Sequence, residues 1–290
     1  MGIKLFMRTD SNGLVSNFRE GQAYYGDQFC NLNFYGLVRS AYHDLFPFYN
    51  KKLIRYLSYG DFVSIESPLA LETLRMLYRS YNREDLVARS FFIPAPVTSD
   101  CKYDSSMVKN NCIISIGRWE SFQKNTPLLV SVLGKILDSH KEYHADIIGS
   151  GEKRLGRLLR SIPFSVRSRI HVRGNIPHSN LASHYQHAKI CFMPSRFESS
   201  CLVAEEALCC GCSLVGPERV RAFNYYILRK SGTVGTSYNT KGLQEALEDE
   251  INAWGNGKRN PEEIAFSWQK EFHAENVSRK ILEIFNGRNE

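Results

Sequence analysis

The sequence predicts an α/β protein built on a parallel sheet. From residue 112 onward, short apolar runs alternate with longer segments whose apolar residues recur at helical spacing, which is typical of repeated strand–helix units. Each apolar run is followed by a turn rich in Gly, Ser, Asn or charged residues. Ligands of open α/β sheets bind outside the carboxyl ends of the strands, so we expect a site at these turns.

The strands and helices of this region follow one another in a regular order. Thr126 and Pro127 predict an N-cap and a first-turn proline for a helix that runs through about residue 137. A basic helix is expected near 152–161 and a long helix over 261–285. The predicted strands are CIISI (112–116), ADII (145–148), RIHVR (169–173), KICFMP (189–194) and SLVG (213–216).

The first hundred residues predict a smaller, helix-rich lobe. The Tyr- and Phe-rich sequence from 22 to 58 indicates mostly helix, and DFVSIES (61–67) with Pro68 predicts a strand followed by a helix. The run Pro94-Ala95-Pro96 reads as a hinge. We therefore expect three parts, at 1–100, 101–270 and 271–290, of which the last is a carboxyl-terminal helix.

Length and composition indicate an ordinary globular protein. The chain has 290 residues, of which 43% are hydrophobic, enough for a substantial core. It has no run of 18 apolar residues, and its start lacks the features of a secretory signal, so we expect a cytoplasmic protein. The formal charge of +7 favours acidic partners such as diphosphates, an anionic membrane surface or nucleic acid, and charge alone does not choose among them.

The eight cysteines lie mostly inside apolar runs and are expected to be reduced core residues. Cys209 and Cys212 form a C-x-x-C, but no second pair and no nearby histidine follows. We therefore expect no metal site.

The stretch RFESSCLVAEEALCCGC (196–212) carries the clearest candidate chemistry. It predicts a strand end, then a turn that holds Glu198, then a helix. Ser199 or Ser200 can cap the start of this helix, and Gly211 can end it.

Glu206 would then lie in the middle of this helix, on or next to its apolar stripe. A buried carboxylate must be paired or bound to a ligand, because burying it alone costs several kcal/mol. The free backbone N–H groups of Cys201, Leu202 and Val203 would favour an anion such as a phosphate.

The run PSRFESSCLVAEEALCCGCSLVGP resembles the E-x7-E signature of the retaining, two-lobed glycosyltransferases of the GT-B fold, most closely family 4. IGRWESFQKN (116–125), IIGSGE (147–152) and VRGNIP (172–177) resemble other segments of that family in the same order and spacing. The resemblance covers about 60–285. It implies a Rossmann-type carboxyl-terminal lobe and a truncated, helix-rich amino-terminal lobe, since members usually carry a longer first lobe with a Gly-rich loop.

The resemblance also implies roles for individual residues. Arg118 and Lys124 would hold the donor diphosphate in place of a metal ion. Glu198 would contact the donor sugar, and Glu206 would bind the ribose hydroxyls. The remaining implied donor contacts are Ser199, Ser200, Cys201, Leu202 and Val203 around the sugar and phosphate, Gly174, Asn175 and Ile176 along the base, and Gly149 and Ser150 in the same cleft.

The function implied is a metal-independent, retaining hexosyltransferase-type enzyme of polysaccharide or glycoconjugate biosynthesis. It would use a nucleoside-diphosphate sugar as donor and no cofactor, with a glycan, a lipid-linked glycan or a small molecule as acceptor. The short first lobe leaves open a non-catalytic nucleotide-sugar-binding or scaffold protein, and a subunit whose acceptor lobe comes from a partner. A peripheral membrane contact also stays open.

The same side chains also have simpler structural explanations. Arg118 and Lys124 could be surface cations, Glu198 could interact with the helix dipole, and Glu206 could pair with an arginine. Nucleic-acid binding is not expected, because no aromatic residues interleave with the basic set Arg154, Arg157, Arg160, Arg167, Arg169 and Arg173, which is better explained as a solvated face.

Overall fold

The computed structural model describes residues 4–9, 48–198, 200–227 and 230–287. The chain divides into two compact units, Met1–Pro94 and Ala95–Glu290. Each unit is an α/β body with its own parallel sheet. The sequence predicts this sheet for the carboxyl-terminal unit, whereas for the amino-terminal unit it predicts a helix-rich lobe. Most of the predicted helical stretch 22–58 lies outside the described residues, and so does Cys30.

The amino-terminal unit contains a three-stranded parallel sheet in the order β1-β2-β3. Pro68 opens α4 at its first turn, as expected, since proline has no N–H to lose there. Leu74, Leu77 and Tyr78 of α4 pack with Val63 of β2 in a small core. The elements are β1 (Phe6–Thr9), α3 (Phe48–Leu57), β2 (Phe62–Ile65), α4 (Pro68–Ser80), α5 (Glu84–Ala88) and β3 (Ser90–Phe92).

The carboxyl-terminal unit is built on a six-stranded parallel sheet in the order β6-β5-β4-β7-β8-β9. All five predicted strands are present. The sixth, β9, was not predicted, because GTVG carries only one large apolar residue. The strands are β4 (Asn110–Ile116), β5 (His144–Ile148), β6 (Ile170–Gly174), β7 (Ala188–Phe192), β8 (Ser213–Pro217) and β9 (Gly232–Gly235).

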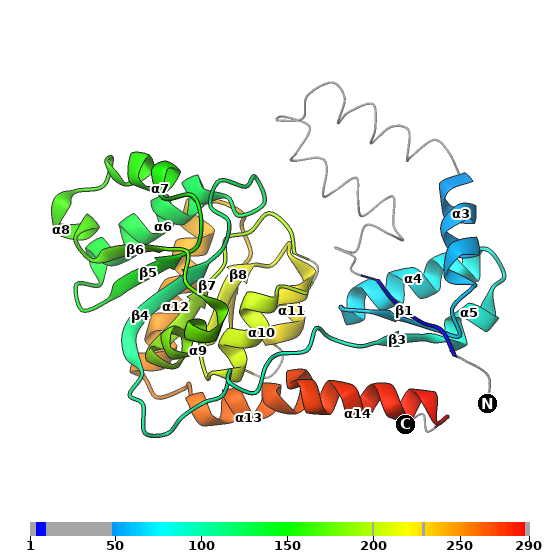
Figure 1. The fold of residues 1–290 in the computed structure, drawn as a ribbon. Helices are drawn as coiled ribbons and strands as arrows, with labels where there is room; N and C mark the ends of the chain where they lie inside the picture. The colour runs from blue at the N-terminus through cyan, green and yellow to red at the C-terminus, as the bar shows by residue number, and fades with distance from the viewer. Residues whose placement is uncertain (1–3, 10–47, 199, 228–229, 288–290) are drawn as a thin grey trace. The chain divides into compact units, whose positions relative to one another are not determined.

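Helices cover both faces of this sheet (Figure 1). On one face, α6, α7, α8 and α12 bury aliphatic side chains such as Leu133, Leu155 and Leu247. On the other face, α9, α10, α11 and α13 bury Tyr185, Phe223 and Trp268. The helices are α6 (Thr126–Ser139), α7 (Glu152–Leu159), α8 (Phe164–Arg167), α9 (His178–His187), α10 (Leu202–Cys209), α11 (Arg221–Ile227), α12 (Thr240–Gly255), α13 (Pro261–Phe272) and α14 (Ala274–Phe285).

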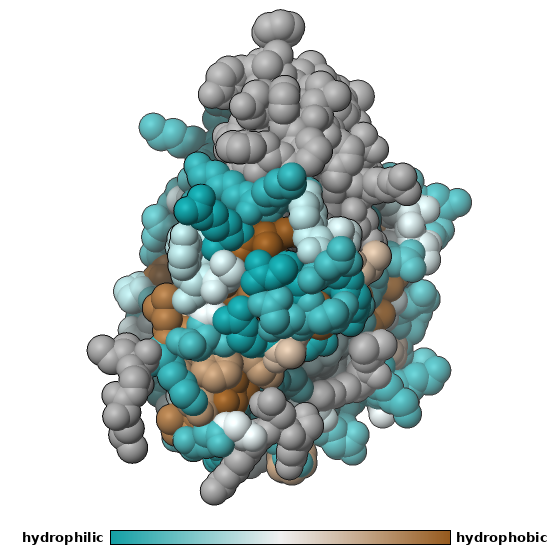
Figure 2. Space-filling model, turned by 90° about the vertical axis from the view of Figure 1, so that its right-hand side faces the viewer, coloured by the Kyte–Doolittle hydropathy of each residue, from teal (hydrophilic) through white to brown (hydrophobic). Residues whose placement is uncertain are grey.

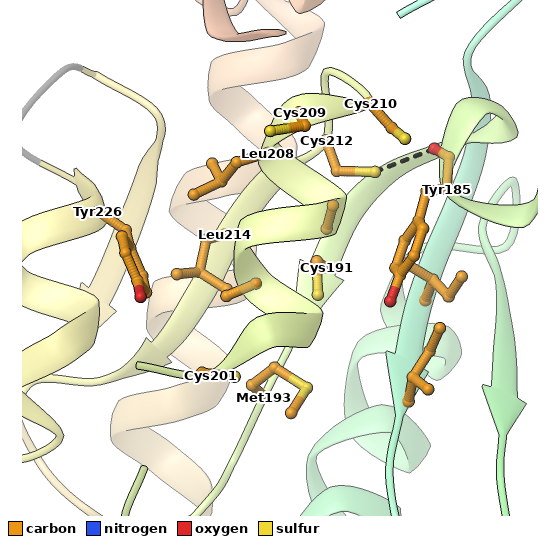
Figure 3. Close-up of a cluster of buried hydrophobic side chains, with 14 of the residues drawn as sticks. Tyr185, Cys191, Met193, Cys201, Leu208, Cys209, Cys210, Cys212, Leu214 and Tyr226 are labelled. Atoms are coloured by element: carbon orange, nitrogen blue, oxygen red, sulfur yellow. Dashed lines mark hydrogen bonds between the residues drawn. The ribbon is translucent and has the colours of Figure 1, made fainter. Parts of the chain in front are cut away.

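The core between the sheet and α9, α10, α11 and α13 is rich in cysteine, as Figure 3 shows around α10. All seven described cysteines are free and buried, as the sequence predicts. The thiol of Cys212 donates to the backbone carbonyls of Tyr185 and Ala188, at 3.0 and 3.2 Å. It therefore serves as a small core residue with a satisfied donor.

Two predicted helix boundaries are wrong. The N-cap of α6 is Asn125, in the left-handed region at φ 48°, and Thr126 is the first helical residue, where its hydroxyl donates to the carbonyl of Trp119. The predicted helix over 261–285 is two helices separated at His273.

This break is caused by the segment that follows the unit boundary. Val97 donates to the carbonyl of Phe272 at 2.8 Å, and its own carbonyl accepts from Ala274 at 3.0 Å. These bonds hold His273 in extended backbone, at φ −58° and ψ 136°. The family resemblance also implies that the carboxyl-terminal helix at 271–290 packs back toward the first lobe, and this stays a prediction.

The face drawn in Figure 2 is mostly hydrophilic among its coloured residues, with smaller hydrophobic areas between them. Among the described helices, none combines the length and the apolar character needed to cross a membrane.

A buried ion pair joins the end of α12 to the sheet. Glu250 is fully buried and accepts from Nε and Nη2 of Arg259, both at 2.7 Å. The hydroxyl of Thr233 on β9 donates to the same carboxylate at 2.7 Å. Removing the arginine would leave an uncompensated buried charge.

We expect Arg259→Ala to lower the free energy of unfolding by about 3–5 kcal/mol. Urea unfolding followed by tryptophan fluorescence measures it, because Trp119, Trp254 and Trp268 all lie in the carboxyl-terminal unit. The matched control is Arg157→Ala, an exposed arginine of α7 with no ion pair among the described residues, for which a change within about 0.5 kcal/mol is expected. Equal losses in the two variants would contradict the assignment.

Candidate active site

The candidate residues lie where adjacent parallel strands end. Gly174 and Asn175 end or follow β6, Gly149 follows β5, Arg118 follows β4, and Glu198 follows β7. The chain runs from β4 through β5 to β6 on one side and returns to β7 on the other side of β4. The point where the strand order reverses is therefore between β4 and β7, where open α/β sheets bind ligands.

Backbone contacts hold the three turns after β4, β5 and β6 against one another. The N–H of Gly149 donates to the carbonyl of Gly174 at 2.7 Å, and the N–H of Gly117 donates to Ile148 at 3.1 Å. Gly149 has φ 113°, and a Cβ built on it would lie 2.0 Å from the Gly117 carbonyl oxygen. Only glycine fits there, so bare backbone lines this edge.

Lys124 and Glu198 form an ion pair across the reversal point. The ammonium lies 2.7 Å from Oε1 of Glu198, and the two side chains are only 12% and 7% exposed. Burial by itself lowers the pKa of Lys124, but Cys201 and Glu198 outweigh it, so the pKa is raised above its ordinary value. Lys124 is therefore charged at neutral pH, with two further N–H donors available.

Gln123 holds Glu198 from the other side and was not predicted. Its amide donates to Oε2 of Glu198 at 3.0 Å and to the carbonyl of Phe197 at 2.9 Å. The N–H of Arg196 donates to the backbone carbonyl of Gln123 at 2.8 Å. The loops after β4 and β7 are thus connected through both backbone and side chains.

Glu206 is buried, as the sequence predicts, but its partners are not arginines. The carboxylate is 4% exposed, with Oε1 at 2.7 Å from Nε2 of His178 and Oε2 accepting from the hydroxyl of Tyr185 at 2.8 Å. Hydrogen bonding to Glu206 and its negative charge raise the pKa of His178. Because His178 opens α9 directly after the turn that follows β6, this contact brings Glu206 to that turn.

The neighbouring glutamate faces a different tyrosine. Glu205 is fully buried and accepts from the hydroxyl of Tyr226 at 2.8 Å. Figure 3 shows Tyr226 and Tyr185 on either side of α10. Consecutive residues of a helix point in different directions, so each glutamate has its own partner.

The amino terminus of α10 differs from the prediction. The N-cap is Cys201, in the left-handed region at φ 65°, without a side-chain cap. Ser200 is buried and does not cap the helix; its carbonyl accepts from the Tyr226 hydroxyl. Ser199 lies outside the described residues. The carboxyl end of α10 lies at Gly211, as predicted. The N–H groups of Gly211 and Cys212 donate to the carbonyls of Leu208 and Ala207 at 3.0 and 2.9 Å, the pattern of a Schellman motif.

The first N–H groups of α10 are available to a ligand. Those of Cys201, Leu202 and Val203 make no hydrogen bond within the part of the chain that the structure describes. Leu202 is 42% exposed and Val203 is half-buried. A helix start of this kind favours an anion.

The remaining predicted residues lie at the same edge of the sheet. Arg118 is exposed, and its guanidinium makes no ion pair with the described residues. The hydroxyl of Ser150 donates to Glu120 at 2.6 Å, which lowers the pKa of that carboxyl. Asn175 is exposed, whereas Ile176 packs against the core behind it.

Some of the arginines between residues 154 and 173 make contacts within the lobe. Arg169 donates to the carbonyls of Tyr143 and His140 at 2.9 and 3.1 Å. Arg154 donates to the carbonyl of Glu120 at 2.9 Å, and Arg173 pairs with Asp146. These three arginines therefore belong to the structure of the lobe itself.

Comparison with protein families identifies the carboxyl-terminal unit. Residues 104–265, more than half of the chain, match the family described as glycosyl transferases group 1. The chain belongs to this family. A search of curated proteins finds no match to this chain.

Solved structures share the fold of this group 1 glycosyltransferase at low identity. Sucrose-phosphate synthase from Thermosynechococcus elongatus aligns over 99% of this chain and 68% of its own, with 17% identity and a TM-score of 0.70. Anabaena HepE in complex with UDP aligns over 84% and 69%, with 12% identity and a TM-score of 0.67. A mutant of S. aureus TarM, in complex with UDP and other ligands, aligns over 83% and 47%, with 15% identity and a TM-score of 0.64.

These likenesses confirm the GT-B-type α/β fold that the sequence predicts. The chain spans about two thirds of the length of the synthase and less than half of the TarM chain.

The His178–Glu206 contact predicts that the stability of the folded protein depends on pH. A histidine whose pKa is raised by folding contributes stability that is full below its ordinary value of about 6.5 and is lost as the pH rises through the folded value. The wild-type protein should therefore lose this contribution between pH 6.5 and the folded pKa, whereas His178→Gln should lack it. NMR titration of the His178 ring should give a pKa above 6.5 that falls in Glu206→Gln.

The matched control is His187→Gln at the other end of α9, in which the His178 ring should keep its raised pKa. An ordinary pKa for His178 in the wild-type protein would show that the contact does not persist in solution.

Proposed function

We propose that this group 1 glycosyltransferase is a retaining, family 4-like enzyme that uses a nucleoside-diphosphate sugar without a metal ion. The observation that carries the proposal is the buried Lys124–Glu198 pair at the reversal point of the sheet, next to the first amides of α10, which have no hydrogen-bond partner among the described residues. This edge offers positive charge and hydrogen-bond donors for a diphosphate, and carboxylates for sugar hydroxyls.

The diphosphate would be bound by Arg118, Lys124 and the first amides of α10. Lys124 keeps donors beyond the one directed at Glu198, and the exposed guanidinium of Arg118 has no competing ion pair among the described residues. Together these groups would stabilise the negative charge on the departing phosphate, the task that a metal ion performs in other enzymes.

The ribose would bind to Glu206. Each carboxylate oxygen of Glu206 has one protein partner and a further lone pair that can accept from a hydroxyl. The Gly174–Ile176 backbone beside His178 would then contact the base, and Gly149 and Ser150 would line the same cleft. UDP is the natural first probe, because several proteins of this fold were solved with UDP.

Transfer would proceed on one face of the donor sugar. The acceptor hydroxyl would attack the anomeric carbon while the bond to the phosphate oxygen breaks, and the departing phosphate would take the hydroxyl proton. Glu198, held by Lys124 and Gln123, would orient the sugar hydroxyls next to that carbon. The expected acceptor is a glycan, a lipid-linked glycan or a small molecule, in a cytoplasmic setting.

We expect Glu206→Ala to weaken UDP binding by about 10- to 100-fold, because hydrogen bonds to a charged group contribute about 1.5–3 kcal/mol. Isothermal titration calorimetry measures the affinity, and circular dichroism confirms that the variant is folded. The control is Glu142→Ala, an exposed glutamate before β5, which should bind UDP like the wild type. Unchanged affinity in Glu206→Ala would refute the ribose assignment.

Arg118→Ala should reduce kcat for donor hydrolysis by about 10²–10³-fold, since a preorganised charge at the leaving group is lost. Arg118 has no ion pair within the described residues, so its removal should not change the thermal stability. The matched control is Lys153→Ala, an exposed cation of α7. A wild-type rate in Arg118→Ala would exclude this role. UDP binding without any turnover in the wild type would instead support a nucleotide-sugar-binding protein.

A further inference from the structure

A thiol, an imidazole and a carboxylate meet on one face of the six-stranded sheet. Cys112 on β4 and His144 on β5 are register partners, and Asp146 lies two residues beyond His144 on the same face. Their ligand-type atoms all lie within 4.8 Å of one another. All three positions are set by strand pairing, and none lies on a loop.

This cluster is separate from the candidate active site. Cys112 is the third residue of β4, whereas Gly117 follows the end of that strand. At about 3.3 Å per residue, the two positions are roughly 16 Å apart along the strand. His144 is the first residue of β5, so the cluster lies toward the amino ends of the strands, opposite the edge that carries Lys124 and Glu198.

The three donors suit a zinc-type cation. Sulfur and imidazole nitrogen together with one carboxylate are typical of Zn²⁺ and its spectroscopic substitute Co²⁺, whereas Mg²⁺ and Ca²⁺ prefer oxygen ligands alone. Cys112 and Asp146 are only 4% and 6% exposed. A tetrahedral ion with bonds of about 2.0–2.3 Å would draw the ligand atoms together by roughly 1 Å.

The surrounding side chains are arranged as outer partners of such a site. Nδ1 of His171 lies 2.9 Å from Oδ1 of Asp146, and Arg173 donates to both oxygens, from Nε to Oδ2 at 2.8 Å and from Nη2 to Oδ1 at 3.2 Å. These contacts orient the carboxylate, and Oδ2, with one donor, keeps a lone pair for a ligand. The ring of His144 makes no hydrogen bond within the described ranges, so its nitrogens are available.

We propose that Cys112, His144 and Asp146 bind one zinc-type divalent cation, with water as the fourth ligand. Coordination replaces the thiol proton of Cys112, which is released to solvent. The ion connects the amino ends of β4 and β5 and so stabilises the sheet far from the transfer chemistry. Sequence spacing does not predict this site, because its ligands come from separate strands.

The test is a titration of the full chain with Co²⁺ after removal of metals with a chelator. We expect a sulfur-to-cobalt charge-transfer band in the near ultraviolet that saturates at one equivalent and is lost when Zn²⁺ displaces the cobalt. Zn²⁺ should also raise the melting temperature of the metal-free protein.

Three variants locate the site. Cys112→Ser should abolish the band, and His144→Ala should weaken Co²⁺ binding by about tenfold or more. The matched control Cys209→Ser removes a thiol of the C-x-x-C and should keep both band and affinity. If Cys112→Ser fails to fold, as judged by circular dichroism, the Co²⁺ affinity of His144→Ala decides the test, because His144 is only half-buried. No band at one equivalent, or a band lost in Cys209→Ser and kept in His144→Ala, would overturn the proposal.

Discussion

The central position of β4 is the constraint on which the rest of this structure depends. β4 pairs in parallel with β5 on one side and with β7 on the other, so the chain must leave it in one direction and return on the opposite side. The loops after β4 and β7 consequently lie at the point where the strand order reverses, where open α/β sheets bind ligands. Lys124 and Glu198 meet there, because each follows one of these two strands. The charge of the candidate site is therefore a consequence of strand order.

The turns at this edge are shaped by backbone contacts more than by side chains. A Cβ at Gly149 would overlap the Gly117 carbonyl, whereas a Cβ at Gly174, which has φ 64°, would meet only the end of the flexible Glu152 side chain. Small residues here allow a ligand to reach main-chain N–H and C=O groups. These groups are the same at every residue, so they distinguish little between similar ligands. Under the proposed function, selectivity for a particular sugar would depend on the few polar side chains around the turns, such as Gln123 and Ser150.

Parallel register has chemical consequences at both ends of the same strands. At the carboxyl ends it gathers turns with backbone amides and cations, and toward the amino ends it places Cys112, His144 and Asp146 on one face. The two groups have opposite character, since one suits an anion and the other a cation. The rigid strand between them keeps the two environments apart.

The sequence by itself determined the first five strands of the carboxyl-terminal sheet, the helices α6, α7 and α10, the burial of Glu206, the end of α10 at Gly211 and the family resemblance. Each of these follows from local pattern, since apolar periodicity and turn residues act over a few positions. Only the tertiary structure decided the partners: His178 and Tyr185 for Glu206, Gln123 for Glu198, and Val97 for the break at His273. These contacts join residues distant in sequence, and a shift of one position in strand or helix packing would replace them. Local pattern does not encode that register, which depends on how whole elements pack against one another.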